Sequence, residues 1–135
     1  MLLQKKKQMK LKKIFPVGVA HIKTSNSNTI VSFSDLLGNI ICWASAGTLH
    51  NKNEKFKNAK KGTPYAAQIA AKNAAEKAIS FGIKTIGVIL KGEGKGNGRE
   101  NSLRALKISG LNIMYIEDNT PLAHNGCRAP KRRKL

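Results

Sequence analysis

Cysteine, aromatic and acidic residues are all scarce in this sequence of 135 residues. The two cysteines, Cys42 and Cys127, lie far apart and form no C-x-x-C pair, which argues against a disulfide framework and a cysteine-rich zinc site. One Trp, two Tyr and four Phe are too few for a protein that stacks successive bases of single-stranded nucleic acid. No apolar run approaches the roughly 20 residues of a membrane-spanning helix, and the N-terminal segment lacks the apolar core of a secretory signal, so we expect no membrane contact.

Positive charge is what the sequence has in excess. Lysine and arginine number 25 against 7 acidic residues, and a net charge of +18 in so small a protein indicates a polyanionic partner. Both ends contribute: residues 1–13 contain six lysines and residues 128–134 five basic groups, with no acid in either segment. The first segment could pass for an organelle presequence, but we favour an RNA-binding tail because it contains no arginine.

Three short runs rich in β-branched residues begin the domain. Residues 18–25 and 28–35 predict a β-hairpin, and residues 40–46 predict a third antiparallel strand. Alternation in the third strand places Ile41 and Trp43 on one face, and we assign Trp43 to the core.

A basic loop and a helix follow. Residues 47–63 contain five lysines and show no apolar period, which predicts a long loop. Thr63 and Pro64 are typical of the N-cap and first turn of a helix, which Gly82 should end. A stripe of small residues lets this helix lie close on a sheet: Ala67, Ala70, Ala71, Ala74 and Ala78, with Phe81.

Residues 83–91 are apolar on both faces, as in a strand covered on both sides. A glycine loop at 92–98 leads to a second helix at 99–110, and residues 111–118 predict the last strand. We expect this helix to turn three residues inward, Leu103, Leu106 and Ile108. The order βββαβαβ predicts an α/β domain with parallel strand–helix–strand crossovers.

The glycine loop is a candidate anion site. It joins a strand to a helix start, where backbone N–H groups and the helix dipole favour phosphate, and it is surrounded by Lys91, Lys95 and Arg99. It matches neither the P-loop pattern nor the dinucleotide-binding pattern. The alternative is a flexible surface turn.

The residues alone leave open a metal site, a catalytic thiol and a nuclease. His124 and Cys127 form H-x-x-C, which could be half of a metal site or a catalytic thiol, although no second ligand pair or scaffold is evident. Asn125-Gly126 predicts a tight turn, and this turn with the cations after it favours an arm that contacts phosphate. The basic cluster could also be a nuclear-localisation patch. A two-metal nuclease would use the main carboxylates, Asp35, Glu93, Glu100, Glu117 and Asp118.

Several motifs together resemble a known family. GVAHIKTSNSNTIVSFSDLLGN, TPYAAQ, VILKGEG and the terminus TPLAHNGCRAPKRRKL are similar in order and spacing to the bacterial and organellar branch of the S-eleven family of small-ribosomal-subunit proteins, from residue 18 to residue 135. The resemblance implies a ribonuclease-H-like, three-layer α/β domain with a mixed sheet. It further implies a structural protein without enzymatic activity or cofactor. Its place would be the platform near the messenger exit path, with small-subunit ribosomal RNA and neighbouring platform proteins as partners.

The resemblance and the basic loops together give a candidate set of RNA-binding residues. In the domain these are Asn28, Thr29, Lys60, Lys61, Thr63, Lys91, Gly92, Lys95, Gly98, Arg99 and Arg104. In the C-terminal segment they are His124, Asn125, Gly126, Cys127, Arg128, Lys131, Arg132, Arg133 and Lys134, and we interpret Cys127 as a small packed residue.

We therefore expect a basic tail at 1–15, an RNA-binding α/β domain at 16–119 and an RNA-binding arm at 120–135. The hypothesis is a structural constituent of the small ribosomal subunit. A metal-dependent nuclease and a free basic nucleic-acid-binding protein are the alternatives. The lysine, asparagine and isoleucine usage favours an organelle, a mitochondrion ahead of a plastid, with a bacterial cytoplasm third.

Overall fold

The computed structural model describes residues 14–48, 56–92, 98–132 and 134. Several sequence-based predictions fall outside these residues. They are the N-terminal tail up to residue 13, residues 49–55 of the basic loop, residues 93–97 of the glycine loop with Glu93 and Lys95, and Arg133.

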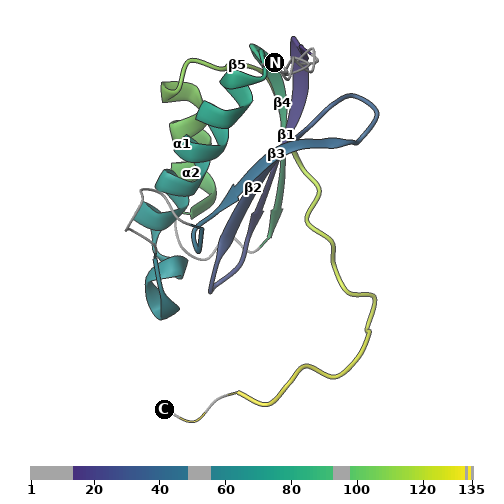
Figure 1. The fold of residues 1–135 in the computed structure, drawn as a ribbon. Helices are drawn as coiled ribbons and strands as arrows, with labels where there is room; N and C mark the ends of the chain where they lie inside the picture. The colour runs from purple at the N-terminus through teal and green to yellow at the C-terminus, as the bar shows by residue number, and fades with distance from the viewer. Residues whose placement is uncertain (1–13, 49–55, 93–97, 133, 135) are drawn as a thin grey trace, which may run out of the picture.

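A five-stranded mixed sheet forms the centre of the domain (Figure 1). Its strands in chain order are β1 (Val17–Thr24), β2 (Thr29–Ser34), β3 (Ile40–Ser45), β4 (Thr85–Gly92) and β5 (Asn112–Asp118). In space the order is β3-β2-β1-β4-β5, with β1 antiparallel to β2, β2 antiparallel to β3, and β4 parallel to both β1 and β5. The predicted α/β class, mixed sheet and element order are confirmed.

Two α-helices cover one face of this sheet and pack against each other (Figure 1). They are α1 (Pro64–Ser80) and α2 (Gly98–Ile108), and a short 3-10 helix, η1 (Asn58–Gly62), precedes α1 within the predicted basic loop. The hydroxyl of Thr63 accepts a hydrogen bond from the backbone N–H of Ala66 at 3.3 Å, so the predicted N-cap is confirmed. None of the described helices is long and apolar enough to cross a bilayer.

The core lies between the helices and the inward-facing residues of β1 to β4. Every alanine predicted on the inner stripe of α1 is buried, together with Ala66 and Ala75. Because these side chains are single methyl groups, the helix backbone can approach the sheet closely, and Phe33 is fully buried beneath it. The small-residue stripe is therefore confirmed as the packing surface of α1.

Two side chains predicted to lie inward point outward instead. Trp43 is 52% exposed, because the inward face of β3 presents Cys42 and Ala44 to α1. Ile108 is 79% exposed at the end of α2, where Ser102 and Ala105 are buried with Leu106. On β3 the small residues Cys42 and Ala44 thus take the inward positions, whereas on α2 Leu106 is buried and Ile108 lies outside the contact.

The second face of the sheet carries no helix among the described residues, so the predicted cover on both sides of β4 is not seen there. A side chain from β5 shields part of this open face: Tyr115 is paired in register with Gly87, and its ring lies where a Cβ of residue 87 would be. Gly87 is buried in this way. The remainder of the face bears Trp43, His21 and Lys23 at exposed or half-buried positions.

Candidate nucleic-acid interface

Four segments meet at one end of the sheet, where β1 and β4 end. These are the β1–β2 turn at 25–28, the end of β4, the segment after β5, and the start of α2. Gly92 allows the meeting, because it has a φ of +126° and a Cβ there would collide with the carbonyl oxygen of Thr24. Any other residue would push the end of β4 away from β1.

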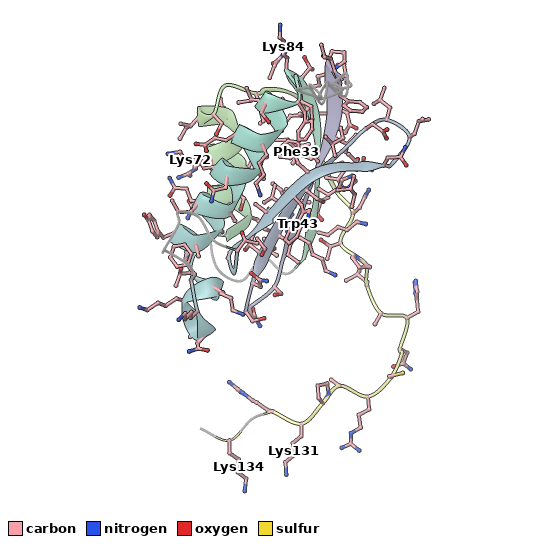
Figure 2. The ribbon with its side chains drawn as sticks, in the orientation of Figure 1. Phe33, Trp43, Lys72, Lys84, Lys131 and Lys134 are labelled. Atoms are coloured by element: carbon pink, nitrogen blue, oxygen red, sulfur yellow. The ribbon has the colours of Figure 1, made fainter. Side chains whose placement is uncertain are left out.

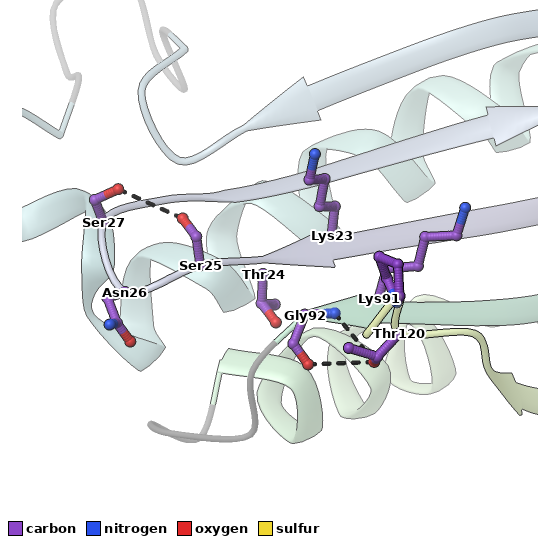
Figure 3. Close-up of a pocket in the computed structure, with 9 residues that line it drawn as sticks. Lys23, Thr24, Ser25, Asn26, Ser27, Lys91, Gly92 and Thr120 are labelled. Atoms are coloured by element: carbon purple, nitrogen blue, oxygen red, sulfur yellow. Dashed lines mark hydrogen bonds between the residues drawn. The ribbon is translucent and has the colours of Figure 1, made fainter. Parts of the chain in front are cut away.

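Two lysines lie side by side at this end. Lys23 on β1 and Lys91 on β4 are direct partners in the parallel register, so both side chains project from the open face of the sheet (Figure 3). Like charges placed opposite each other on neighbouring strands repel. An anion between the two ammonium groups would turn this repulsion into attraction.

The lysines border a hollow of about 640 Å³. The described residues of its lining include no carboxylate; they are Lys23, Thr24, Ser25, Asn26, Ser27, Lys91, Gly92, Thr120 and Pro121 (Figure 3). Its positive potential also affects His21, whose pKa is lowered by burial and by the nearby charge of Lys91. His21 is half-buried, and its Nε2 lies 2.9 Å from the hydroxyl of Ser34.

One buried hydroxyl in the wall of the hollow lacks a partner. Within the described residues, the Oγ1 of Thr24 is buried without a hydrogen bond. Buried polar side chains almost always have a partner. Thr24 follows Lys23 on β1, so its side chain lies on the opposite face of the sheet from the two lysines.

The basic segment before α1 packs against the same end of the domain. A Cβ at Gly62 would collide with the carbonyl oxygen of Asn26, so the chain of η1 touches the β1–β2 turn. Lys60 and Lys61 in the last turn of η1 are thereby brought near this turn. The sequence predicted these cations as RNA contacts but gave no reason for them to be near Asn28.

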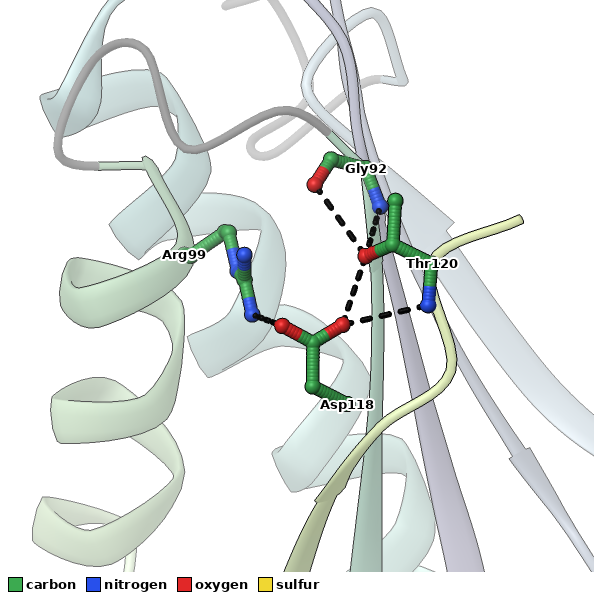
Figure 4. A network of polar contacts seen from close by, with 4 residues as sticks. All are labelled: Gly92, Arg99, Asp118 and Thr120. Carbon is green, nitrogen blue, oxygen red and sulfur yellow. Dashed lines mark hydrogen bonds and ion pairs between the residues drawn. The ribbon is translucent and has the colours of Figure 1, made fainter. Parts of the chain in front are cut away.

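A polar network holds the segment that follows β5 (Figure 4). The hydroxyl of Thr120 lies 3.3 Å from both the backbone N and O of Gly92, and it also bonds to the carboxylate of Asp118. Arg99 Nη2 at the start of α2 donates to the same carboxylate at 2.6 Å. Hydrogen bonds from Thr120 and then from Arg99 lower the pKa of Asp118 to about 2.

This network gives a pH prediction. Because the folded-state pKa of Asp118 lies below its unfolded value of 3.8, its contribution to stability is complete above pH 4 and is lost as pH falls towards 2. Thr120→Val should raise the Asp118 midpoint towards 3.8, as measured by a carboxyl carbon NMR titration. Thr85→Val is the control, because Thr85 lies at the opposite end of β4 and outside this network. It should leave the midpoint unchanged. A midpoint near 3.8 in the unsubstituted protein would show that the network does not form in solution.

The C-terminal arm extends away from the domain after Pro121 (Figure 2). Its described residues are exposed and form neither helix nor strand, and Lys131 and Lys134 project from the chain clear of the sheet and helices. Asn125 has a φ of +55°, which agrees with the bend predicted at Asn125-Gly126. Cys127 is exposed, so the interpretation of a packed thiol is wrong for the isolated chain.

The structure brings some predicted site residues together and separates others. Four predicted residues lie at the end of the sheet where β1 and β4 end: Asn28, Thr29, Gly92 and Gly98. Thr29 is buried there. Both arginines of α2 have an intramolecular carboxylate partner: Arg99 pairs with Asp118 at 2.6 Å, and Arg104, farther along the helix, with Glu100 at 3.8 Å. The sequence missed Lys23, Ser25 and Thr120, because only the parallel pairing of β1 with β4 places them beside Lys91.

The geometry gives no support to the metal or thiol readings. In the described part of the chain, no three His, Cys, Asp or Glu residues come close enough to hold a metal ion. Asp35 lies in the β2–β3 turn and Asp118 at the other end of the sheet. Burial raises the pKa of the Cys42 thiol to about 11, which keeps it protonated and unreactive.

Among the described residues, this arrangement presents positive charge that suits an anion. Comparison with known proteins identifies the family. Residues 18–134 match the family described as Ribosomal protein S11. A small ribosomal subunit protein uS11 from Desulfovibrio desulfuricans is 47% identical over 126 residues, which cover 93% of this chain and 92% of that relative. The chain belongs to the Ribosomal protein S11 family, whose members are structural, non-enzymatic constituents of the small ribosomal subunit.

Proposed function

We propose that this protein binds small-subunit ribosomal RNA through the lysine-bordered hollow, η1 and the C-terminal arm. Family membership implies ribosomal RNA and small-subunit proteins as partners. The single observation that carries the proposed site is the in-register pair Lys23 and Lys91, on the rim of a hollow whose described lining residues include no carboxylate. A phosphodiester fits it, because a phosphate can accept from both ammonium groups and from the hydroxyls of the β1–β2 turn.

The mode of binding is electrostatic and geometric. Exposed aromatic side chains do not line the hollow, so bases are not stacked there. The α/β body instead holds the phosphate-binding elements at set positions, and the arm reaches along the RNA. This division supports an organisation of tail 1–15, domain 16–119 and arm 120–135, with Thr120 as the residue that fastens the arm to β4.

The position within the ribosome and the compartment are also proposals. The family resemblance of the sequence favours the platform near the messenger exit path. The residue usage alone favours an organelle, and the similarity to a bacterial relative does not support that choice. We therefore propose only the small ribosomal subunit as the location.

Sedimentation of a native lysate tests this function directly. At moderate salt, the protein followed by mass spectrometry should travel with small-subunit ribosomal RNA, and at high salt a fraction should be released because phosphate contacts are screened. A protein that remains at the top of the gradient at moderate salt would contradict the proposal. Binding to any duplex with equal affinity would then favour a free nucleic-acid-binding protein.

A further inference from the structure

One part of this basic chain contains no cation. Residues 29–51, which follow the β1–β2 turn, include neither lysine nor arginine and hold a single acid, Asp35, in a protein of net charge +18. This segment contains the whole β2–β3 hairpin. A hairpin that contacts RNA phosphate would be expected to carry positive charge, as the segments at 52–61 and 91–99 do.

The turn of this hairpin is held in one shape. The Oδ1 of Asp35 accepts hydrogen bonds from the backbone N–H groups of Leu37 at 2.9 Å and Asn39 at 2.8 Å, and its Oδ2 accepts from the side chain of Asn39 at 3.1 Å. Two backbone bonds close the same turn: the N–H of Asp35 donates to the carbonyl oxygen of Asn39 at 3.0 Å, and the N–H of Gly38 donates to the carbonyl oxygen of Asp35 at 3.2 Å. These bonds lower the pKa of Asp35, the side-chain bond to Asn39 most of all, so the carboxylate stays charged.

The ordered turn displays apolar side chains to solvent. Leu36 is 73% exposed, Leu37 88% and Ile40 65%, and we call these three residues the hairpin tip. The tip projects from the body of the molecule (Figure 1). It lies at the end of the sheet where β1 begins, because Ser34 pairs with Val19, whereas the lysine-bordered hollow lies where β1 ends.

We infer that the hairpin tip docks into an apolar hollow on a neighbouring basic protein of the small subunit. This inference rests on the proposed function, which supplies the setting in which such a neighbour is present. Two exposed leucines on a turn held by five hydrogen bonds can enter an apolar hollow with little loss of conformational freedom. Asp35 beside them is complementary to a cation on the rim of that hollow and is repelled by RNA phosphate.

Site-specific crosslinking identifies what the tip touches. A photoreactive benzophenone side chain at position 37, in the full-length protein within purified small subunits, should give one crosslink to a small-subunit protein, mapped by mass spectrometry to apolar residues next to a cation. The same group at position 108, which is also exposed, is the matched control and should not give that crosslink. Crosslinks from position 37 to ribosomal RNA or to a second copy of this chain would overturn the inference. The absence of any protein crosslink would overturn it as well.

A competition experiment measures the contribution of the tip. Leu36→Ser with Leu37→Ser should lower incorporation into small subunits roughly tenfold or more against unsubstituted protein, because two anchoring side chains lose their burial. The control, Ile79→Ser with Ile108→Ser, removes two exposed apolar side chains outside the hairpin tip and should incorporate normally. Equal incorporation of both variants would overturn the docking role. Absence of the unsubstituted protein from subunits would instead contradict the proposed function.

Discussion

Truncation after Pro121 should leave the domain as stable as before while it weakens the salt-sensitive binding of ribosomal RNA. The described residues beyond Pro121 are exposed and add nothing to the core, so the free energy of unfolding should change by less than about 0.5 kcal/mol. The truncation keeps Thr120 and therefore the bonds to Gly92 and Asp118. It removes the five cations between residues 128 and 134.

The expected loss of affinity follows from counterion release. Each phosphate neutralised contributes about 0.7 to 0.9 to the log–log slope of affinity against salt, so five lost contacts should reduce the slope by about 3.5 to 4.5. Titration of a small-subunit ribosomal RNA fragment at several salt concentrations measures this slope, and thermal unfolding checks the fold. An arm of full length with its cations changed to glutamine separates charge from chain length. Unchanged incorporation of the truncated protein into subunits would show that the arm is dispensable.

Replacing both lysines of the hollow, Lys23→Gln with Lys91→Gln, should weaken RNA binding strongly and without loss of stability. The two side chains are exposed and repel each other, so removing their charges relieves an unfavourable interaction in the free protein. The salt slope should fall by about 1.4 to 1.8, which corresponds to roughly 25- to 60-fold weaker binding at 0.1 M salt when the relation is extended to 1 M.

A matched pair of lysines provides the control for this change. Lys72 lies on the outside of α1 and Lys84 precedes β4, both away from the hollow (Figure 2). Lys72→Gln with Lys84→Gln alters the net charge equally, so it should reproduce only the general loss of attraction. If the two double variants weaken binding by the same factor, the hollow is not a specific phosphate site and only net charge matters.

The predictions about secondary structure succeeded where local chemistry decides the conformation. Thr63 and Pro64 begin α1 because a hydroxyl cap and a fixed φ are properties of those residues themselves. The assignment of Trp43 and Ile108 to the core failed for a different reason. Alternation tells which residues share a face, but Cys42 and Ala44 are also apolar, and only packing against the alanine stripe of α1 selects them as the inward set.

Composition and short-range patterns in the sequence were enough to indicate the family, the order of the elements and the charged C-terminal segment. They also predicted an anionic partner. Those properties depend on residue identity and on neighbours a few positions apart. The tertiary structure decided the pairing of Lys23 with Lys91, the contact of η1 with the β1–β2 turn, and the face on which Trp43 lies. These three depend on parallel strand register and on helix–sheet packing between segments far apart in the chain, which no local pattern specifies.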